Sequence, residues 1–457
     1  MTKTPAAIRD IEHTLHGFVE LNAHRENGST VITGGKGVWV FDEKGTPYLE
    51  GAAGMWCASL GFGEQALMDA ANEQFAKLPY YHSVAFKTTH PAIDLAERLA
   101  TRVPIKNAKV NFCLSGSEAN DFLVKIVRFY NNAIGRPRKK KIIARVNGYH
   151  GATLMATSLT GITANHAGFD LPLPGVLHVS DPKAFSNALS GETEADFAAR
   201  LCGELEEKIL QEGPDTVAAF IAEPVTGAGG VVIPPAGYYE GVQQILKRYD
   251  VLFLADEVIT GFCRTGKYWG STSMGMTPNT MTLAKGLTSA YQPLAAIVLS
   301  DEIYRGLELG SANLGWFGHG TTYAGHPVGC AVALKVMELI EERGIEAHVA
   351  RVAQTFSKRL DVLRDLPFVG DVRSIGLMGA VEFVVDKKTK TPFNPKGSFA
   401  KALKERAEQK YHLICRTLAG GDSCAFSPPL IITEEEINEM FDRFTKALAD
   451  VAAGYMH

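Results

Sequence analysis

Short apolar segments alternate with amphipathic segments over most of this chain. Strand-like segments, which are mostly apolar, occupy residues 109–113, 141–146, 176–179, 217–222, 251–255, 281–284 and 295–299. Between them, apolar positions recur with helical spacing, for example over residues 118–130, 196–210 and 238–249. Fully apolar strands that alternate with helices are typical of a parallel sheet covered on both faces. The pattern therefore predicts an α/β core over residues 60–325.

The two ends of the chain have a different pattern. Residues 34–50 predict a hairpin that turns at Glu43-Lys44-Gly45. After a long helix over 326–344 come strand-like segments at 379–385 and 413–416, and helices at 399–409 and 433–453. Thr433 and Glu436 form a capping-box pattern that opens the last helix. The C-terminal part is expected to be a smaller α+β domain, which the N-terminal hairpin joins.

Composition narrows the classes of function. The net charge of −4 gives no electrostatic reason to expect nucleic acid or an anionic membrane as a partner, and the basic segment 136–141 is interpreted as a solvated loop. No apolar segment approaches the ~18–20 residues that span a bilayer, and the N-terminus lacks the pattern of a secretory signal. The seven cysteines contain no C-x-x-C pair, so we expect neither a disulfide framework nor a metal site. A cytoplasmic location is predicted.

Polar residues stand at the ends of three predicted strands. Asp256 follows segment 251–255, Lys285 follows 281–284, and Glu223 follows 217–222. Ligands of open parallel sheets bind beyond the carboxyl ends of the strands. Lysine is rarely buried without a partner, so one interpretation is an ion pair between Lys285 and Asp256. The other is a cofactor lysine that forms an imine with an aldehyde, while Asp256 keeps a pyridine nitrogen protonated.

A phosphate site is predicted where a strand meets a helix, in the segment Leu114-Ser115-Gly116-Ser117-Glu118. Gly116 allows a close backbone approach, the start of the helix offers free N–H groups, and Ser117 adds a hydroxyl. The same residues are also explained by a plain capping box between Ser115 and Glu118. This motif alone does not separate the two interpretations.

An aromatic cover for a cofactor ring is offered by Tyr149, which follows segment 141–146 and precedes His150. Taken singly, a tyrosine at a strand end is more often a boundary core residue, and a histidine such as His150 is more often a buried residue with satisfied hydrogen bonds. Val258 lies two positions after Asp256. If that segment is extended, Val258 shares a side with Asp256 and packs against the opposite ring face.

The combination of these motifs resembles the class III aminotransferases of the pyridoxal-phosphate fold type I superfamily, in particular the ω-transaminase subgroup. The matching stretches are SGSEAND (115–121), YHG (149–151), AEPVTGAGG (222–230), DEVITGFCRTG (256–266), LAKGL (283–287) and GHGTTYAGHP (318–327). The resemblance implies a large domain, residues 58–329, with a mostly parallel seven-stranded sheet. It also implies a small α+β domain from residues 1–57 and 330–457, and a homodimer with shared active sites, with tetramers left open.

The resemblance implies roles for single residues. Lys285 would be the Schiff-base lysine and proton shuttle, and Asp256 would bind the pyridine nitrogen. Thr322 would reach the phosphate bound by the partner protomer, and Glu223 would lie near the ring and interact with a movable arginine. With the residues derived above, the expected binding set for pyridoxal 5′-phosphate is Gly116, Ser117, Tyr149, His150, Glu223, Asp256, Val258, Lys285 and Thr322.

The resemblance also implies a substrate pocket. Trp56 and Phe86 match aromatic pocket residues, with Phe86 contributed across the dimer, although both would also suit simple packing at a dimer interface. Arg416 matches an arginine that clamps a substrate carboxylate and swings away from uncharged amines, or is a surface arginine without a role. The expected substrate residues are Trp56, Phe86, Tyr149, Ala228 and Arg416.

The predicted function is transfer of an amino group from an amine or ω-amino acid to pyruvate by a ping-pong mechanism. Three alternatives stay open at this point. The acceptor could be 2-oxoglutarate, as in ornithine and 4-aminobutyrate enzymes. The chain could be an aminomutase or a decarboxylase on the same fold. It could also be a ligand-binding protein that has lost the cofactor.

Overall fold

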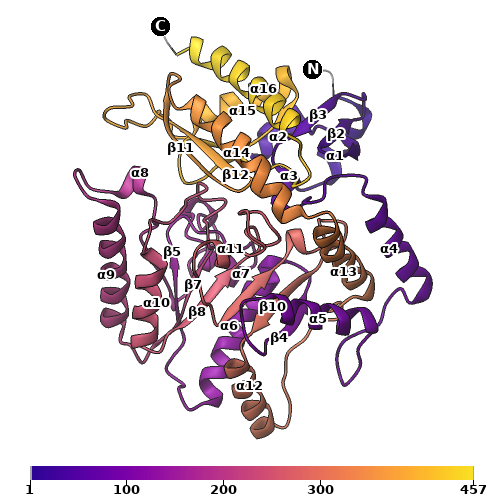
Figure 1. Ribbon diagram of the computed structural model, residues 1–457, viewed down its shortest axis with the longest axis vertical. Coiled ribbons are helices and arrows are strands. Elements are labelled where there is room, and N and C mark those ends of the chain that lie inside the picture. Colours follow the sequence, from indigo (N-terminus) through magenta and orange to yellow (C-terminus); the bar gives the residue numbers. More distant parts are fainter. Residues whose placement is uncertain (1–2, 456–457) are drawn as a thin grey trace.

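The computed structural model describes residues 3–455 and contains a central seven-stranded sheet (Figure 1). The strand order is β4-β10-β9-β8-β7-β5-β6. Strand β10 is antiparallel to both its neighbours, and the other pairs are parallel. This confirms the predicted α/β fold with a mostly parallel sheet. The strands are β4 (Lys109–Cys113), β5 (Lys141–Arg145), β6 (Val176–Val179), β7 (Val217–Ala222), β8 (Leu252–Asp256), β9 (Thr280–Leu283) and β10 (Ala295–Leu299).

Helices cover both faces of this sheet, which explains why its strands are apolar throughout. Ile142 of β5 packs in one core cluster with Val124 of α6, whereas the adjacent Ile143 packs in another with Val242 of α10. Successive strand residues point to opposite faces, so both faces need apolar side chains. The helices of this part are α4 (Gln65–Lys77), α5 (His90–Arg102), α6 (Gly116–Ala133), α7 (Leu154–Leu159), α8 (Ala184–Asn187), α9 (Glu194–Glu212), α10 (Tyr238–Arg248), α11 (Gly270–Ser273), α12 (Asp301–Leu314), α13 (Pro327–Glu342) and the 3₁₀ turns η1 (Thr163–Asn165) and η2 (Lys285–Leu287).

The two ends of the chain fold together, above the central sheet in the view of Figure 1. Strand β13 pairs in parallel with β3, with Leu413 opposite Leu49, so a C-terminal strand completes the N-terminal sheet β1-β2-β3-β13. A second sheet has the order β11-β12-β15-β14. These elements are α1 (Pro5–His13), α2 (Leu21–Asn27), β1 (Ile32–Lys36), β2 (Trp39–Asp42), β3 (Pro47–Glu50), α3 (Ala53–Trp56), α14 (Ile345–Leu363), β11 (Val369–Ile375), β12 (Met378–Phe383), α15 (Ser398–Tyr411), β13 (Leu413–Ile414), β14 (Arg416–Leu418), β15 (Ser423–Phe426) and α16 (Glu434–Ala453).

One predicted strand is divided in the structure. Segment 413–416 was expected to be continuous, but it breaks at Cys415 into β13 and β14, which belong to different sheets. Leu413 pairs with β3 while Arg416 pairs with Ala425 of β15. The chain therefore passes from one sheet to the other at a buried residue, a change that hydrophobic periodicity does not show.

The domain boundaries at 57/58 and 329/330 remain our proposal. Pairing of β3 with β13 supports a small domain built from both ends of the chain. Helix α13 runs without interruption across the second boundary. Within residues 3–455, no helix is both long enough and apolar enough to cross a membrane.

The capping box of α16 gives a test of local stability. Thr433 Oγ1 accepts a hydrogen bond from Glu436 N (3.2 Å), and Glu436 Oε2 accepts one from Thr433 N (2.9 Å). We expect Thr433→Ala to lower the free energy of unfolding by about 1 kcal/mol, because the Glu436 amide at the helix start loses its partner. The midpoint of thermal unfolding measures this loss. Thr433→Ser keeps the hydroxyl and is the matched control, so equal loss in both variants would contradict the role of the cap.

Candidate active site

Five strand ends converge on one cavity. Lys285 follows β9, Asp256 ends β8, Glu223 follows β7 and Tyr149 lies beyond β5. Helix α6 begins just after β4. Since these five strands run in the same direction, their carboxyl ends meet at one edge of the sheet. The cavity there has a volume of about 690 Å³. Of the expected site residues, it is lined by Trp56, Gly116, Ser117, Tyr149, His150, Glu223, Ala228, Asp256, Val258, Lys285 and Arg416.

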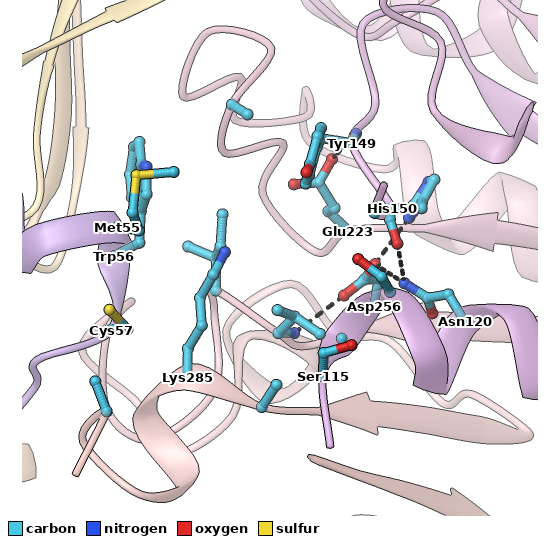
Figure 2. A pocket seen from close by; sticks show the side chains of 18 of the residues that line it. Met55, Trp56, Cys57, Ser115, Asn120, Tyr149, His150, Glu223, Asp256 and Lys285 are labelled. Atoms are coloured by element: carbon cyan, nitrogen blue, oxygen red, sulfur yellow. Dashed lines mark hydrogen bonds and ion pairs between the residues drawn. The ribbon is translucent and has the colours of Figure 1, made fainter. Parts of the chain in front are cut away.

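The carboxylate of Asp256 is buried and held by three donors (Figure 2). Its Oδ2 accepts hydrogen bonds from Asn120 Nδ2 (2.7 Å) and His150 Nδ1 (2.8 Å). Its Oδ1 accepts from Val258 N (3.1 Å). These partners take the place of the ion pair with Lys285 that the sequence left open. Asp256 thus presents a carboxylate in a fixed position at the cavity wall, as a pyridinium nitrogen requires.

Lys285 points into the open space opposite Asp256 and Tyr149 (Figure 2). Burial lowers the pKa of Lys285, while the nearby Asp256 carboxylate acts in the opposite direction. A lowered pKa increases the share of neutral amine, which is the nucleophilic form. The backbone of Lys285 is left-handed, with φ of 49°. Left-handed non-glycine residues are strained and cluster at functional sites, and Trp56 (φ 65°) and Phe86 (φ 63°) share this feature.

The start of α6 has the features of an anion site. Ser115 Oγ accepts from Glu118 N (3.1 Å), so the predicted cap exists. The N–H groups of Gly116 and Ser117 have no hydrogen-bond partner among residues 3–455. A Cβ on Gly116 would lie 2.9 Å from Val258 Cγ2, so only glycine fits without displacing Val258. Capping and phosphate binding are therefore compatible, because they use different N–H groups.

Tyr149 and Glu223 are held together at the cavity wall. Glu223 Oε1 accepts from Tyr149 N (3.0 Å) and Oε2 accepts from Gly227 N (2.8 Å). Burial raises the pKa of the Glu223 carboxyl, and burial also raises the pKa of the Tyr149 phenol. The Glu223 carboxylate uses backbone amides in this structure, whereas the Arg416 guanidinium contacts Met55 Sδ.

Val258 lines the cavity by a route other than the expected one. The chain turns directly after Asp256, and the Val258 amide bonds back to the Asp256 side chain. The extended geometry that we expected for this segment is therefore wrong. Val258 still faces the cavity, because this turn directs it towards Gly116.

Two of the expected residues lie outside the cavity of the single chain. The Phe86 side chain is fully exposed, with a relative exposure of 107%. Thr322 is also exposed, and its carbonyl oxygen accepts a hydrogen bond from Tyr80 (2.8 Å). Their assignment to a site shared across a dimer stays a prediction.

Sequence reasoning missed several cavity residues. Asn120 lies one turn into α6 and donates to both Asp256 Oδ2 and the His150 carbonyl oxygen (2.7 Å each). Its position in SGSEAND at the cavity end of the helix could have indicated it. Phe18 and Cys57 also line the cavity. Phe18 lies in an irregular segment far away in sequence, and no local pattern indicates its position.

The arrangement fits pyridoxal 5′-phosphate. A buried carboxylate, a lysine of lowered pKa and unpaired N–H groups at a helix start surround one cavity. The buried Asn120 Oδ1 beside Asp256 also has no hydrogen-bond partner in residues 3–455. The carboxylate matches a protonated ring nitrogen, the lysine matches an aldehyde, and the N–H groups match a phosphate dianion.

The chain belongs to the class III aminotransferases, whose family profile, "Aminotransferase class-III", matches residues 21–448. Members of this family use pyridoxal phosphate, and the protein is a pyridoxal-phosphate-dependent aminotransferase of fold type I. This confirms the predicted family, cofactor and reaction class.

Relatives and solved structures agree on this class. The chain is 45% identical to gamma aminobutyrate transaminase 1 of Solanum lycopersicum, over 92% of this chain and 81% of that protein. It is 41% identical to the diaminobutyrate–2-oxoglutarate transaminase of Halomonas elongata, over 97% and 95%. The omega transaminase of Pseudomonas jessenii in complex with PMP superimposes with a TM-score of 0.97 at 46% identity, over 98% and 99%. An engineered thermostable omega transaminase has a tryptophan, a phenylalanine and an arginine replaced for synthesis of bulky amines. It superimposes with a TM-score of 0.96 at 46% identity, over 98% of this chain and 99% of that chain.

The close contact at Gly116 leads to a test of the phosphate site. We expect Gly116→Ala to weaken binding of pyridoxal phosphate by about 10-fold, which corresponds to ~1.4 kcal/mol, because the new methyl group displaces Val258 or the helix start. Titration of the apoenzyme, followed by cofactor absorbance, measures the affinity. Gly203→Ala on α9, where a Cβ meets open space, is the control.

The double variant Gly116→Ala/Val258→Ala identifies the cause. On the Val258→Ala background the clash partner is absent, so adding Gly116→Ala should cost little further affinity. An equal loss on both backgrounds would show that the contact with Val258 is not the reason.

Proposed function

We propose that this aminotransferase moves the amino group of an amine or ω-amino acid to pyruvate in a ping-pong reaction. One observation carries the choice of pyruvate. Of the described residues that line the cavity, only one is an arginine, Arg416. Arginine binds a carboxylate through two parallel hydrogen bonds, so one arginine suits an acceptor with one carboxylate.

2-Oxoglutarate has a second carboxylate, which must be desolvated in the same cavity. The other cationic candidate there, Lys285, is needed at the reacting carbon. The acidic wall formed by Glu223 and Asp256 disfavours a further negative charge. Leaving a carboxylate buried without a cation is costly, which supports pyruvate over 2-oxoglutarate.

The residues of the chain divide the work of the reaction. Pyridoxal phosphate, when bound, supplies the electron sink and carries the amino group between the two half-reactions. Lys285 Nζ removes the proton from the amine-bearing carbon of the donor, a task for which its lowered pKa suits it. Three donors hold the Asp256 carboxylate in place, and the amides of Gly116 and Ser117 would hold the phosphate.

The donor side of the cavity supports amines without an α-carboxylate. Trp56 is buried in the wall, and Tyr149, Ala228 and Phe18 add largely apolar surface. Arg416 can leave the cavity centre because its guanidinium is held by a thioether and not by a carboxylate. The engineered neighbour, altered at a tryptophan, a phenylalanine and an arginine for bulky amines, supports a role for residues of these types.

A second candidate is transfer to 2-oxoglutarate. The name of the Halomonas elongata relative specifies that acceptor. Aminomutase and decarboxylase activities on the same fold are separated by the products, because only an aminotransferase forms one amino acid for each keto acid consumed.

We also propose a homodimer with shared active sites. The full exposure of the aromatic Phe86 and the exposure of Thr322 support a second protomer that uses both residues.

We propose a cytoplasmic location because all seven cysteines are free thiols.

Lys285 is the most direct test of the chemistry. We expect Lys285→Ala to abolish turnover, because Lys285 is the one lysine among the described residues that line the cavity, while cofactor still binds through the phosphate site and Asp256. Steady-state turnover and bound cofactor are measured on the same preparation. Appreciable turnover in this variant would refute the role of Lys285.

The acceptor is tested by comparing pyruvate with 2-oxoglutarate, with 1-phenylethylamine as the donor. We expect a higher kcat/KM with pyruvate. We also expect Arg416→Ala to raise the KM for pyruvate by about 10–100-fold, the value of a hydrogen-bonded ion pair, and to leave the KM for the amine donor, which has no carboxylate, nearly unchanged.

Arg416→Lys is the matched variant for this experiment. It keeps the charge but loses the two-pronged geometry, so its KM for pyruvate should lie between those of the native protein and Arg416→Ala. A higher kcat/KM with 2-oxoglutarate would establish the second candidate instead.

A further inference from the structure

Three side chains with metal-binding groups meet near the N-terminus. Asp10 lies on α1, His16 in the irregular segment 14–20, and His24 on α2. The Asp10 carboxylate faces His16 Nε2 at 2.9 and 3.0 Å and His24 Nε2 at 3.2 Å. Ser29 Oγ also donates to Asp10 (2.6 Å). These four side chains are spread over residues 10–29, so their contacts fold this segment back on itself.

The geometry of the cluster suits one metal ion. Its three ligand atoms lie within 4.8 Å of one another, and within residues 3–455 it is the one group of three histidine, cysteine or acidic side chains that does so. Ligand atoms at ~2.0–2.1 Å from a tetrahedral zinc ion lie roughly 3.3 Å apart. The nitrogen–oxygen distances of 2.9–3.2 Å are close to this value. Two imidazoles and a carboxylate are a usual ligand set for zinc.

The charges of the cluster also suit a cation. Asp10 supplies the carboxylate ligand, and Ser29 Oγ holds that carboxylate in place by a hydrogen bond. Both imidazoles direct Nε2 at that carboxylate. An ion can replace the two Nε2 protons when each neutral ring carries its proton on Nδ1 instead. His24 is mostly buried, whereas His16 and Asp10 keep partial access to solvent through which an ion can enter.

The segment that the cluster closes reaches the active site. Phe18 lies two positions after His16 and lines the cavity that also contains Trp56 and Arg416. The Phe18 side chain is 76% exposed, and its backbone is left-handed with φ of 57°. Core packing therefore contributes little to fixing this residue. Its position depends on how firmly segment 14–20 is held at each end.

We propose that Asp10, His16 and His24 bind one divalent zinc-class ion, and that this ion holds Phe18 at the active-site cavity. The metal site itself is independent of the proposed function. Its effect on amine donors rests on that function, because it acts through the substrate cavity.

The metal site is tested with zinc chloride alone on chelator-treated holoenzyme. Isothermal titration should show one tight site per chain in the native protein. Asp10→Asn, His16→Gln and His24→Gln should each lose about 10–100-fold or more in affinity, since even the loss of a supporting residue costs this much. His13→Gln is the matched control, because His13 is an exposed histidine on the same helix outside the cluster.

Two results would overturn the metal site. One is the absence of a tight site in the native protein. The other is equal zinc affinity in His13→Gln and in the three cluster variants, which would place the ion elsewhere. Thermal unfolding of each variant without zinc shows whether the fold is retained.

The link to the cavity has its own readout. Zinc should lower the KM for 1-phenylethylamine in the native protein and in His13→Gln, and should leave it unchanged in His24→Gln. Phe18→Ala should bind zinc normally but lose this change in KM. Zinc binding without any change in KM would refute the link to Phe18 alone, and absence of aminotransfer would refute the proposed function while the titration still decides the metal site.

Discussion

The carboxylate of Asp256 is buried at the end of β8, and a buried charge is stable only when polar groups compensate for it. Asn120 supplies one donor from α6, and His150 supplies another from the loop beyond β5. The Val258 amide supplies a third and turns the chain towards Gly116. Satisfying one charge therefore fixes the helix start, the loop with Tyr149 and the turn after β8 relative to one another. The proposed cofactor site is built from these three elements.

The rest of the cavity comes from a different part of the fold. Trp56 and Arg416 lie in the portion formed by the two ends of the chain, where β13 joins β3 and the chain then crosses into the second sheet at Cys415. In our proposal, the sheet edge of this chain holds the reacting groups, and residues on the other wall select the donors and acceptors that fit.

The relatives differ in the substrates that their names specify, although they share the family. The number of arginines in the cavity is a physical criterion that applies to any of them, because each buried carboxylate needs a cation. For this chain the criterion supports our proposal of an acceptor with one carboxylate. Overall similarity does not contain this information, since a few wall residues decide it.

The alternation of apolar strands and helices determined the α/β core. The positions of Lys285, Asp256 and Glu223 at strand ends indicated that these three residues share one edge of the sheet, because parallel strands end at a common edge. The capping box of α16 was also fully local. Only the tertiary structure placed Asn120 against Asp256, divided the strand at Cys415 and brought Phe18 into the cavity. Short-range periodicity reports which face of an element is buried, whereas these contacts join segments whose separation in sequence carries no periodic signal.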